Sequence, residues 1–458
     1  MTLSRDLARR WMAARAAAAP PAIRDLARLH LADVVGAGLA AASLAQGAPY
    51  VRFARGAGRG AIAPLAGARV AHAATAALID GGLIHALEYD DTHTASIIHG
   101  GAVVAPVALA LAQETGVSTQ RALDAYLLGY EALILLGLAA PGAFQARGFQ
   151  VTSVAGPMAA ALVACDLLGA DEDQRVHAVG IALSQGAGVF EFLTNGASVK
   201  SLHPGWAAHA GIVAARLAMA GLTGPETALE GERGLYASFA GDAQAPARLA
   251  ALLTQFGARW RIGEVAFKFL PCCHYLHPFV EAAGEIAARC APERMAEITL
   301  RIAPGAAPVV CEPWDAKIAP KDGHAMRWSL PLVVAERLLG REVGHAFFSA
   351  QPRQDALSLA RRMRWEPLVM NRFPQAFEAE IRCRLDDGKI IERRVEDVYG
   401  NPSRPARRED VRAKFRANAG RSLPPARAAA LEALFFAPEG QGGAYADLLC
   451  PGADGGSA

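Results

Sequence analysis

The segment from His85 to His99 constrains the fold of this chain more than any other feature, because it places many ionisable groups between two apolar stretches. It holds three carboxylates and three imidazoles in fifteen residues. An alanine-rich apolar segment, 71–87, leads into it, and another apolar run, 100–106, follows at once. Burying unpaired charge is expensive, so a cluster in this setting is expected to line a cavity. A helix C-terminus followed by a solvated polar loop is the alternative.

The overall composition narrows the class of protein. The chain has 458 residues, which is enough for two or three domains. Hydrophobic residues make up 52% and charged residues 20%, a balance that allows a large core and argues against disorder. With 46 basic and 44 acidic side chains, the net charge of +2 gives no sign of a nucleic-acid-binding surface or a basic membrane patch.

The number and spacing of the cysteines, together with the length of the apolar runs, indicate the cellular compartment of the protein. The seven cysteines are odd in number, and only Cys272 and Cys273 are close in sequence. Adjacent cysteines cannot clamp a metal as a CxxC pair does, so we expect neither a disulfide framework nor a zinc ribbon. The first residues lack the apolar core of a signal peptide, and runs such as 132–140 are too short and interrupted to span a bilayer. We therefore expect a cytoplasmic protein with no membrane segment.

Residues 1–265 are expected to form a large all-helical domain. Pro20-Pro21 separates two helices within residues 4–45, and a turn region rich in glycine and proline follows over 46–68. Helical spacing and cap residues predict further helices at 70–88, 101–114, 119–137, 153–168, 173–187 and 205–220. No strand pattern of useful length occurs before residue 250, so close packing of alanine-rich helices is expected in this half.

The pattern changes near residue 262 to one that is typical of a compact α+β domain, which we assign to residues 266–402. Alternating residues predict strands at 295–302 and 377–385. Asp386-Asp387-Gly388 then predicts a hairpin turn into a strand at 389–395. Helices are expected between these strands, at 276–289, 329–339 and 353–363.

The chain turns helical again after Asn401-Pro402. Helices are predicted at 408–418 and 424–435, and we expect residues 403–450 to return to the first domain and complete it. The last residues, 451–458, have the composition of a frayed end. The predicted fold class is therefore an α domain formed by both chain ends combined with an α+β domain.

Three further stretches carry polar groups that an apolar helix does not need. Lys200 and His203 precede a helix predicted near residue 205, and a helix N-terminus beside a lysine suits a carboxylate or phosphate. An exposed loop lysine with a capping histidine is the simpler interpretation of that stretch alone. Lys268 lies between two phenylalanines at the domain boundary, where it would either pair with an anion or snorkel from a hinge. The amide of Gln150 can bind a substrate oxygen but cannot transfer protons.

Common catalytic and metal-binding motifs do not occur in the sequence. There is no dinucleotide fingerprint at a strand-to-helix turn, no P-loop, no HExxH and no GxSxG nucleophile elbow. Cys272 and Cys273 have no evident activating partner and are expected to pack in the core. Asp90, Asp91 and His93 could hold a divalent cation, but magnesium sites usually use carboxylates and water, so we expect neither metal nor cofactor.

Together, these stretches resemble the MmgE/PrpD family, which includes 2-methylcitrate dehydratases, cis-aconitate decarboxylases and an iminodisuccinate epimerase. The resemblance spans nearly the whole chain, and the motifs occur in the expected order. It rests on residues 85–93 with His99, on 199–205 and 268–277, and also on 221–225 and 328–331.

The resemblance implies a smaller α+β lid inserted into a large helical domain, a homodimer, and neither a metal nor an iron–sulfur cluster. It implies that the pocket is lined by Asp90, Asp91, Thr92, His99, Lys200 and Lys268. Decarboxylase-type members have histidines where this chain has Gln150 and Cys273, and an aspartate where it has Glu88. These departures argue against cis-aconitate decarboxylation.

We therefore predict proton abstraction next to a carboxylate of a small di- or tricarboxylic acid. Lys200 and Lys268 would neutralise the carboxylate, because the carbanion is otherwise too unstable. His99 would be the general base or acid, since imidazole titrates near working pH, and Asp91 would orient a histidine or act as partner acid. The groups expected to contact the substrate are Asp90, Thr92, Gln150, His203 and His277.

The sequence separates the possible outcomes of this chemistry poorly. Loss of a β-hydroxyl would make the protein a hydro-lyase, for example of 2-methylcitrate, and we favour this outcome because it is the commoner activity among the relatives. Return of the proton on the other face would make it an epimerase. A catalytically silent protein that binds a polycarboxylate is a third interpretation.

Overall fold

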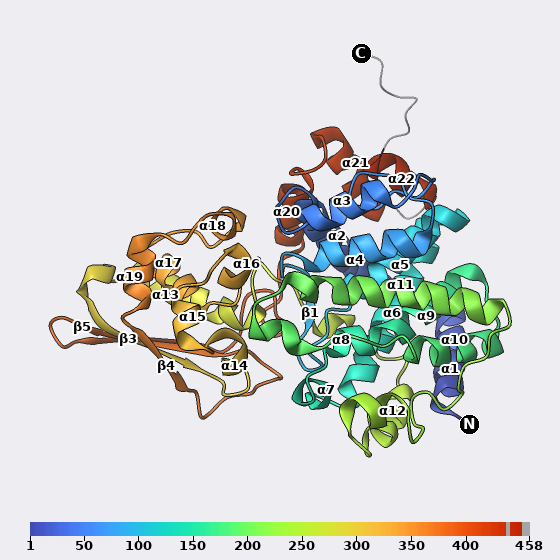
Figure 1. Cartoon of the computed structure of the whole chain (residues 1–458), viewed down its shortest axis with the longest axis horizontal. Helices are drawn as coiled ribbons and strands as arrows, with labels where there is room; N and C mark the ends of the chain where they lie inside the picture. The colour runs from blue at the N-terminus through green and yellow to red at the C-terminus, as the bar shows by residue number, and fades with distance from the viewer. Residues whose placement is uncertain (437–439, 451–458) are drawn as a thin grey trace, which may run out of the picture. The chain divides into compact units, whose positions relative to one another are not determined.

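The structure is a computed structural model that describes residues 1–436 and 440–450. The predicted frayed end, 451–458, lies outside the described residues. The chain divides into two compact units (Figure 1). Unit 1 comprises Met1–Phe192, Ala197–Phe267 and the described part of Arg407–Ala458, and unit 2 comprises Leu193–Gly196 and Lys268–Ala406. Helices predominate in the described chain, which confirms the expected α-rich class.

Unit 1 is built almost entirely from helices. Their bounds are α1 Leu3–Ala17, α2 Pro21–Ala42, α3 Ala48–Gly56, α4 Ala73–His85, α5 Gly101–Thr115, α6 Thr119–Leu138, α7 Ala143–Ala146, α8 Val151–Val154, α9 Gly156–Leu168, α10 Glu172–Leu183, α11 Leu202–Met219, α12 Ala245–Leu253, α20 Arg408–Ala419, α21 Pro425–Phe436 and α22 Gly443–Leu449. Helix α3 lies within the stretch that we expected to be turns, and α12 and α22 were not predicted. Pro49 near the start of α3 is compatible with a helix there, since proline is tolerated in the first turn.

Close contact between α4 and α11 positions the chemically important segments of unit 1. A Cβ atom on Gly81 would lie 2.6 Å from the Cα of Gly205, so the two backbones meet where both residues lack a side chain. This crossing lies near the end of α4 and the start of α11. The segment that follows α4 and the segment that precedes α11 are therefore held close together.

The C-terminal helix α20 packs against α2, as expected for helices that return to the N-terminal half. A Cβ on Gly36 of α2 would lie 3.1 Å from the ring of Phe415, so glycine is needed for this close packing. Lys414 of α20 forms a buried ion pair with Asp33 of α2, at 2.8 Å between Nζ and Oδ1. Both contacts tie the end of the chain to its beginning.

Unit 2 contains a four-stranded sheet in the order β4-β3-β5-β6. Strand β3 (Met295–Ile302) has the predicted bounds and pairs antiparallel with β5 (Ala379–Leu385), which continues through the predicted hairpin into β6 (Ile390–Val395). Strand β4 (Met363–Pro367) runs parallel to β3. It was missed because we extended the preceding helix to residue 363, whereas that helix ends at Ala360.

Helices cover the sheet of unit 2. Their bounds are α13 His277–Ala287, α14 Ala307–Val310, α15 Trp314–Ile318, α16 Gly323–Met326, α17 Leu330–Leu338, α18 His345–Ser349 and α19 Gln354–Ala360. Helix α13 packs against β5 and β6 and also against α17, and the two helices lie on the same side of the sheet (Figure 1). The core of unit 2 lies between this layer and the inner face of the sheet.

One stretch of unit 1 is long and apolar enough, by length and composition, to cross a membrane. It runs over Val151–Leu168, and 94% of it is buried inside the structure. The expectation that every apolar run is too short or too interrupted is therefore wrong for this stretch. Core helices of folded proteins pass the same test, so the finding is weak evidence for a membrane span.

Candidate active site

The segment from α4 to α5 is folded into the interior of unit 1 rather than into solvent. Strand β1 (Thr92–His93) pairs with β2 (Val265–Ala266), and the N–H and C=O of His93 both bond to Ile98. The six ionisable side chains between His85 and His99 are all buried, with His99 the most exposed at 9%. The solvated-loop alternative is therefore wrong, and these groups must be paired within the protein.

The backbone is strained at two points of this segment. Glu88 has φ 53° and Ile97 has φ 55°, a left-handed region in which residues other than glycine are uncommon. Ile97 is β-branched, so the conformation is especially costly there. Strain of this kind costs on the order of 1–3 kcal/mol per residue and persists where the surrounding structure enforces it, often at functional sites.

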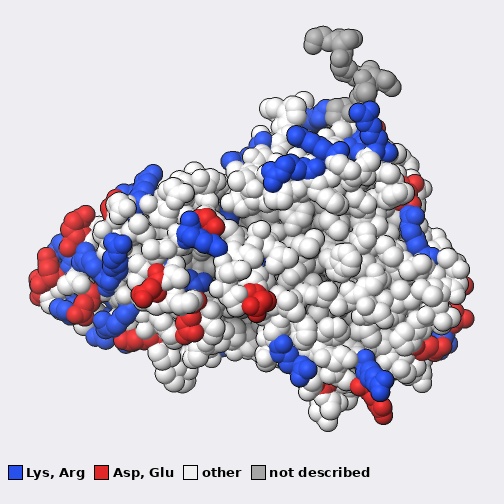
Figure 2. Space-filling model, viewed as in Figure 1, with Lys and Arg blue, Asp and Glu red and all other residues white. Residues whose placement is uncertain are grey.

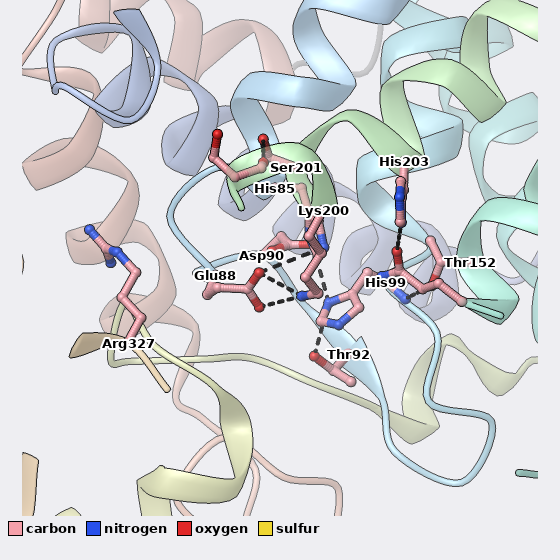
Figure 3. Close-up of polar contacts among 12 residues, drawn as sticks. His85, Glu88, Asp90, Thr92, His99, Thr152, Lys200, Ser201, His203 and Arg327 are labelled. Carbon is pink, nitrogen blue, oxygen red and sulfur yellow. Dashed lines mark hydrogen bonds and ion pairs between the residues drawn. The ribbon is translucent and has the colours of Figure 1, made fainter. Parts of the chain in front are cut away.

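Asp90 is the central carboxylate of the cluster (Figure 3). Its Oδ2 accepts hydrogen bonds from Nδ1 of His85, at 2.9 Å, and from Nδ1 of His99, at 3.2 Å. Burial alone would raise the pKa of Asp90, but the two imidazoles outweigh it and hold this pKa well below its usual range. Asp90 is thus an ionised, buried group that fixes the orientation of two histidines, and its expected role as a substrate contact stays a prediction.

His99 has one nitrogen that is engaged and one that is available. Nδ1 faces Asp90, the carbonyl of Asp91 at 3.1 Å and the hydroxyl of Thr92 at 3.4 Å, while the backbone N–H donates to Oγ1 of Thr152. Nε2 makes no hydrogen bond to any residue in the described part of the chain. Burial lowers the pKa of His99 to about 4, more than Asp90 raises it. A neutral imidazole with a free Nε2 lone pair is suited to accept a proton.

Asp91 lies beside Asp90 in sequence but has a different partner. Its Oδ2 accepts a hydrogen bond of 2.8 Å from Nδ1 of His30 on α2, and both side chains are fully buried. The His30 ring stacks on Phe267 with centroids 4.0 Å apart. Our expectation that Asp91 orients a histidine holds for His30, whereas the catalytic candidate His99 is oriented by Asp90. The two neighbouring carboxylates thus have different histidine partners.

Lys200 is paired with a carboxylate of the protein itself. It lies in a short 3-10 helix, Ser198–Ser201, directly before α11, and its Nζ lies 2.5 and 2.7 Å from the two carboxylate oxygens of Glu88. Both side chains are buried. The carboxylate of Glu88 also lies 3.8 Å from Nε2 of His85, so ionic contacts run without a break from Lys200 to His99. A substrate carboxylate would have to share Lys200 with Glu88.

His203, which lies near His99 in Figure 3, forms a hydrogen-bonded pair with Gln150. Nδ1 of His203 lies 2.5 Å from Oε1 of Gln150, so it carries the proton and donates it. Burial, together with smaller contributions from His85 and Lys200, lowers the pKa of His203 to about 4. The structure thus brings the predicted substrate contacts Gln150 and His203 together with the His99 cluster, and it fixes the tautomer of His203 through an amide.

Lys268 and His277 belong to unit 2. Lys268 is fully buried, and His277 is buried at the start of α13, where its ring packs edge-on against His274 with centroids 4.7 Å apart. Their expected roles as a cationic clamp and a substrate contact stay predictions. Cys272 and Cys273 are buried in the core of unit 2, as expected.

Three side chains of the cluster could also coordinate a metal. His85, Asp90 and His99 offer ligand atoms that all lie within 4.8 Å of one another. The contacts of 2.9 and 3.2 Å that join Asp90 to the two Nδ1 atoms are ordinary hydrogen-bond distances. Hydrogen bonds from the two imidazoles to Asp90 are therefore enough to account for the arrangement of these three side chains. The adjoining ion pair of Glu88 and Lys200 extends the cluster.

Sequence reasoning missed several residues that support the site. His30 and Asp33 lie three apart on the apolar helix α2, and this polar pair in a buried helix was the available signal. Lys414, which pairs with Asp33, also donates to the carbonyl of Tyr89 at 2.9 Å and lies 3.8 Å from the centre of its ring. Lys414 thus connects α20 to the strained segment, and no local sequence pattern indicates this contact.

The site brings together a buried imidazole that is oriented by a carboxylate and a buried lysine, an arrangement that is typical of enzymes that transfer protons. Comparison with known families is more specific. The model of the MmgE/PrpD N-terminal domain matches residues 5–248, and that of the MmgE/PrpD C-terminal domain matches residues 270–435. The chain belongs to the MmgE/PrpD family.

Comparison with individual proteins agrees with this membership. The chain is 30% identical to the cis-aconitate decarboxylase of Homo sapiens over 368 residues, which covers 76% of this chain and 73% of the relative. It is 30% identical to the enzyme of the same name from Mus musculus, covering 76% and 72%, and 25% identical to that of Aspergillus terreus strain NIH 2624, covering 75% and 74%. The chain is a lyase of this family.

Proposed function

We propose that this lyase is a cofactor-independent dehydratase of a small di- or tricarboxylic acid that carries a β-hydroxyl group, such as 2-methylcitrate. The observation that carries the proposal is the pair of Asp90 and His99. Asp90 holds the proton of His99 on Nδ1, and the lowered pKa keeps the ring neutral at pH 7. Nε2 is then ready to remove a proton from the carbon next to a substrate carboxylate.

The elimination balances with groups of this site. The C–H bond breaks and its proton passes to Nε2 of His99, and the electron pair forms a carbon–carbon double bond. The β-hydroxyl leaves as water with the proton that His99 took up, which returns His99 to its neutral state. Lys200 carries the positive charge that the developing carbanion and its carboxylate require. It acts close to the reacting centre, because its charge contributes to the low pKa of His99. Lys268 is proposed as the second cation.

Decarboxylation of cis-aconitate is the second candidate, supported by the names of the relatives. Loss of carbon dioxide leaves a carbanion that must then receive a proton, so the enzyme needs a protonated acid near the reacting carbon. His99 and His203, both with pKa about 4, are neutral at pH 7 and poor donors from Nε2. Dehydration needs no additional proton donor, so the neutral state of both histidines favours dehydration over decarboxylation. Epimerisation shares the first step but then needs a protonated acid on the opposite face, and neutral His203 would be a poor donor there too.

A proton NMR time course in deuterium oxide, with citrate-like and succinate-like acids and cis-aconitate, tests these alternatives. Dehydration predicts vinyl signals with release of water from the hydroxy acid, and loss of this activity in His99→Asn. Deuterium incorporation without vinyl signals would indicate epimerisation, and carbon dioxide release from cis-aconitate would indicate decarboxylation. No exchange with any acid, while a ligand still raises the melting temperature, would refute catalysis and favour a silent binding protein.

We also propose that the protein forms a homodimer through the face of unit 1 that contains α11. Three large apolar side chains of α11 are exposed: Trp206 at 36%, Leu217 at 40% and Met219 at 36%. The surface of unit 1 in view carries few charged side chains over this helix (Figure 2). Light scattering should give twice the chain mass, and Trp206→Glu should lower it, whereas a monomer in the unaltered protein would refute the proposal.

A further inference from the structure

Unit 2 contains a cavity of about 330 Å³ that is lined only by its own residues. Its walls are mainly apolar and are formed by the rings of Phe269 and Tyr399 and by Leu270, Val280, Val343 and Val398. The two rings pack at 5.2 Å between centroids. A volume of this size is at the lower end of the range for small-molecule sites, which combine apolar walls with a few placed polar groups.

The positive group of this cavity is Arg337 on α17. Its side chain is half-buried and forms no ion pair with a carboxylate among the described residues. Its Nη1 makes one long hydrogen bond, 3.4 Å, to the carbonyl of Arg341. Arg341 itself, four residues later, is paired with Glu336 and Asp355. The guanidinium of Arg337 therefore retains most of its donors for an anion in the cavity.

The packing of α13 makes room for this guanidinium. A Cβ on Gly284 would lie 2.7 Å from Nε and from Nη2 of Arg337, so the Arg337 head group would have to shift to admit a side chain there. Glycine inside a helix is destabilising relative to alanine, so its presence here needs a local reason. Space for the Arg337 head group against α13 provides that reason.

Two carboxylates also line the cavity, and they differ in their partners. Glu281 accepts the backbone N–H of Tyr399 at 2.9 Å and is paired with Arg404. Glu342 is exposed and forms no ion pair with any described residue, including Arg337. The cavity thus offers one unpaired cation and one unpaired anion beside apolar walls.

We propose that this cavity binds a zwitterionic α-amino acid with an apolar side chain. The carboxylate would pair with Arg337, the ammonium group would face Glu342, and the side chain would lie against Val280, Val343 and Tyr399. A simple carboxylate would leave Glu342 without a partner, and a simple amine would leave Arg337 without one, so both should bind more weakly. This proposal does not depend on the reaction proposed for unit 1, although His277, which we expected to contact the substrate of that reaction, also lines the cavity.

Calorimetry on the full chain tests the proposal with leucine, with 4-methylpentanoate, which lacks the ammonium group, and with 3-methylbutylamine, which lacks the carboxylate. Leucine should bind at least about tenfold more tightly than either analogue, because each analogue loses one charge-assisted contact. Arg337→Gln should weaken leucine binding by at least about tenfold. Glu342→Gln, at an exposed position, should remove the preference for leucine over 4-methylpentanoate.

Three controls connect the result to this cavity. Gly284→Ala should weaken binding without changing any charge, because it displaces the Arg337 head group. Arg361→Gln, a matched change at an exposed arginine of the same unit that lines no part of this cavity, should leave binding unchanged. His99→Asn should retain leucine binding. Absence of leucine binding to the unaltered protein would overturn the proposal, and so would leucine binding by Arg337→Gln and by Glu342→Gln that is as tight as that of the unaltered protein.

Discussion

Replacing Asp90 by asparagine should remove most of the activity while leaving the protein folded. Oδ2 of Asp90 accepts hydrogen bonds from both His85 and His99, at 2.9 and 3.2 Å. An amide is uncharged and can present its NH2 group to a ring nitrogen, which would favour the tautomer of His99 with its proton on Nε2. That tautomer cannot accept a proton from the substrate.

The expected loss follows from the contribution of a general base. Such a base typically contributes roughly 10²–10⁴-fold to the rate, which corresponds to about 3–5 kcal/mol of barrier. Stability should change less. Charge-assisted hydrogen bonds contribute about 1.5–3 kcal/mol each, but the variant no longer has to bury a charge, so we expect a net loss of about 1–3 kcal/mol.

The neighbouring carboxylate provides a matched control, since Asp90 and Asp91 are both fully buried and both bond to a histidine. Steady-state kinetics and urea unfolding of Asp90→Asn and Asp91→Asn should give similar losses of stability. The loss of kcat should be much larger for Asp90→Asn, because His30 is the side-chain partner of Asp91. Equal kinetic losses, or a larger loss for Asp91→Asn, would refute the assignment of Asp90 as the orienting residue.

Three further predictions follow from other buried groups. The acid limb of kcat/KM should lie near pH 4, because burial lowers the pKa of His99 to about 4; a limb near pH 6.5 would contradict a neutral base. Lys200→Met should cost about 3–5 kcal/mol in urea unfolding by stranding Glu88 as a buried charge, and adding Glu88→Gln should recover part of this loss. Burial raises the pKa of Asp80 to about 8, despite the Leu65 N–H bond, so the folded state keeps a proton that the unfolded chain releases near pH 3.8. Stability is then lost as pH rises towards 8, and Asp80→Asn should remove that slope in melting curves.

Much of the helical framework was predictable because it is encoded by local periodicity. The order and approximate bounds of α1, α2, α4 to α6 and α9 to α11 agree with the predicted ranges. Strand β3 and the β5–β6 hairpin were found from alternation and from Asp386-Asp387-Gly388. The elements that were missed include α3, β4, α12 and α22, which are all short, so the local signal is weak and tertiary contacts decide.

The sequence by itself determined which stretch gathers the ionisable groups. Six such groups between His85 and His99, flanked by apolar segments, predicted a paired and enclosed cluster, since free charge cannot be buried cheaply. Lys200, His203 and Gln150 were also identified from the sequence, because they are polar groups that an apolar helix does not need.

Only the tertiary structure decided which side chains pair with each other. The pairing of Lys200 with Glu88 spans 112 positions, and that of His30 with Asp91 spans 61. Such pairs are set by how α2, α4 and α11 pack, including the glycine contact between Gly81 and Gly205. The assignment of Asp90 rather than Asp91 to His99 depends on the direction in which each carboxylate leaves the backbone. The identity of neighbouring residues does not encode that direction, because it is fixed by contacts made far along the chain.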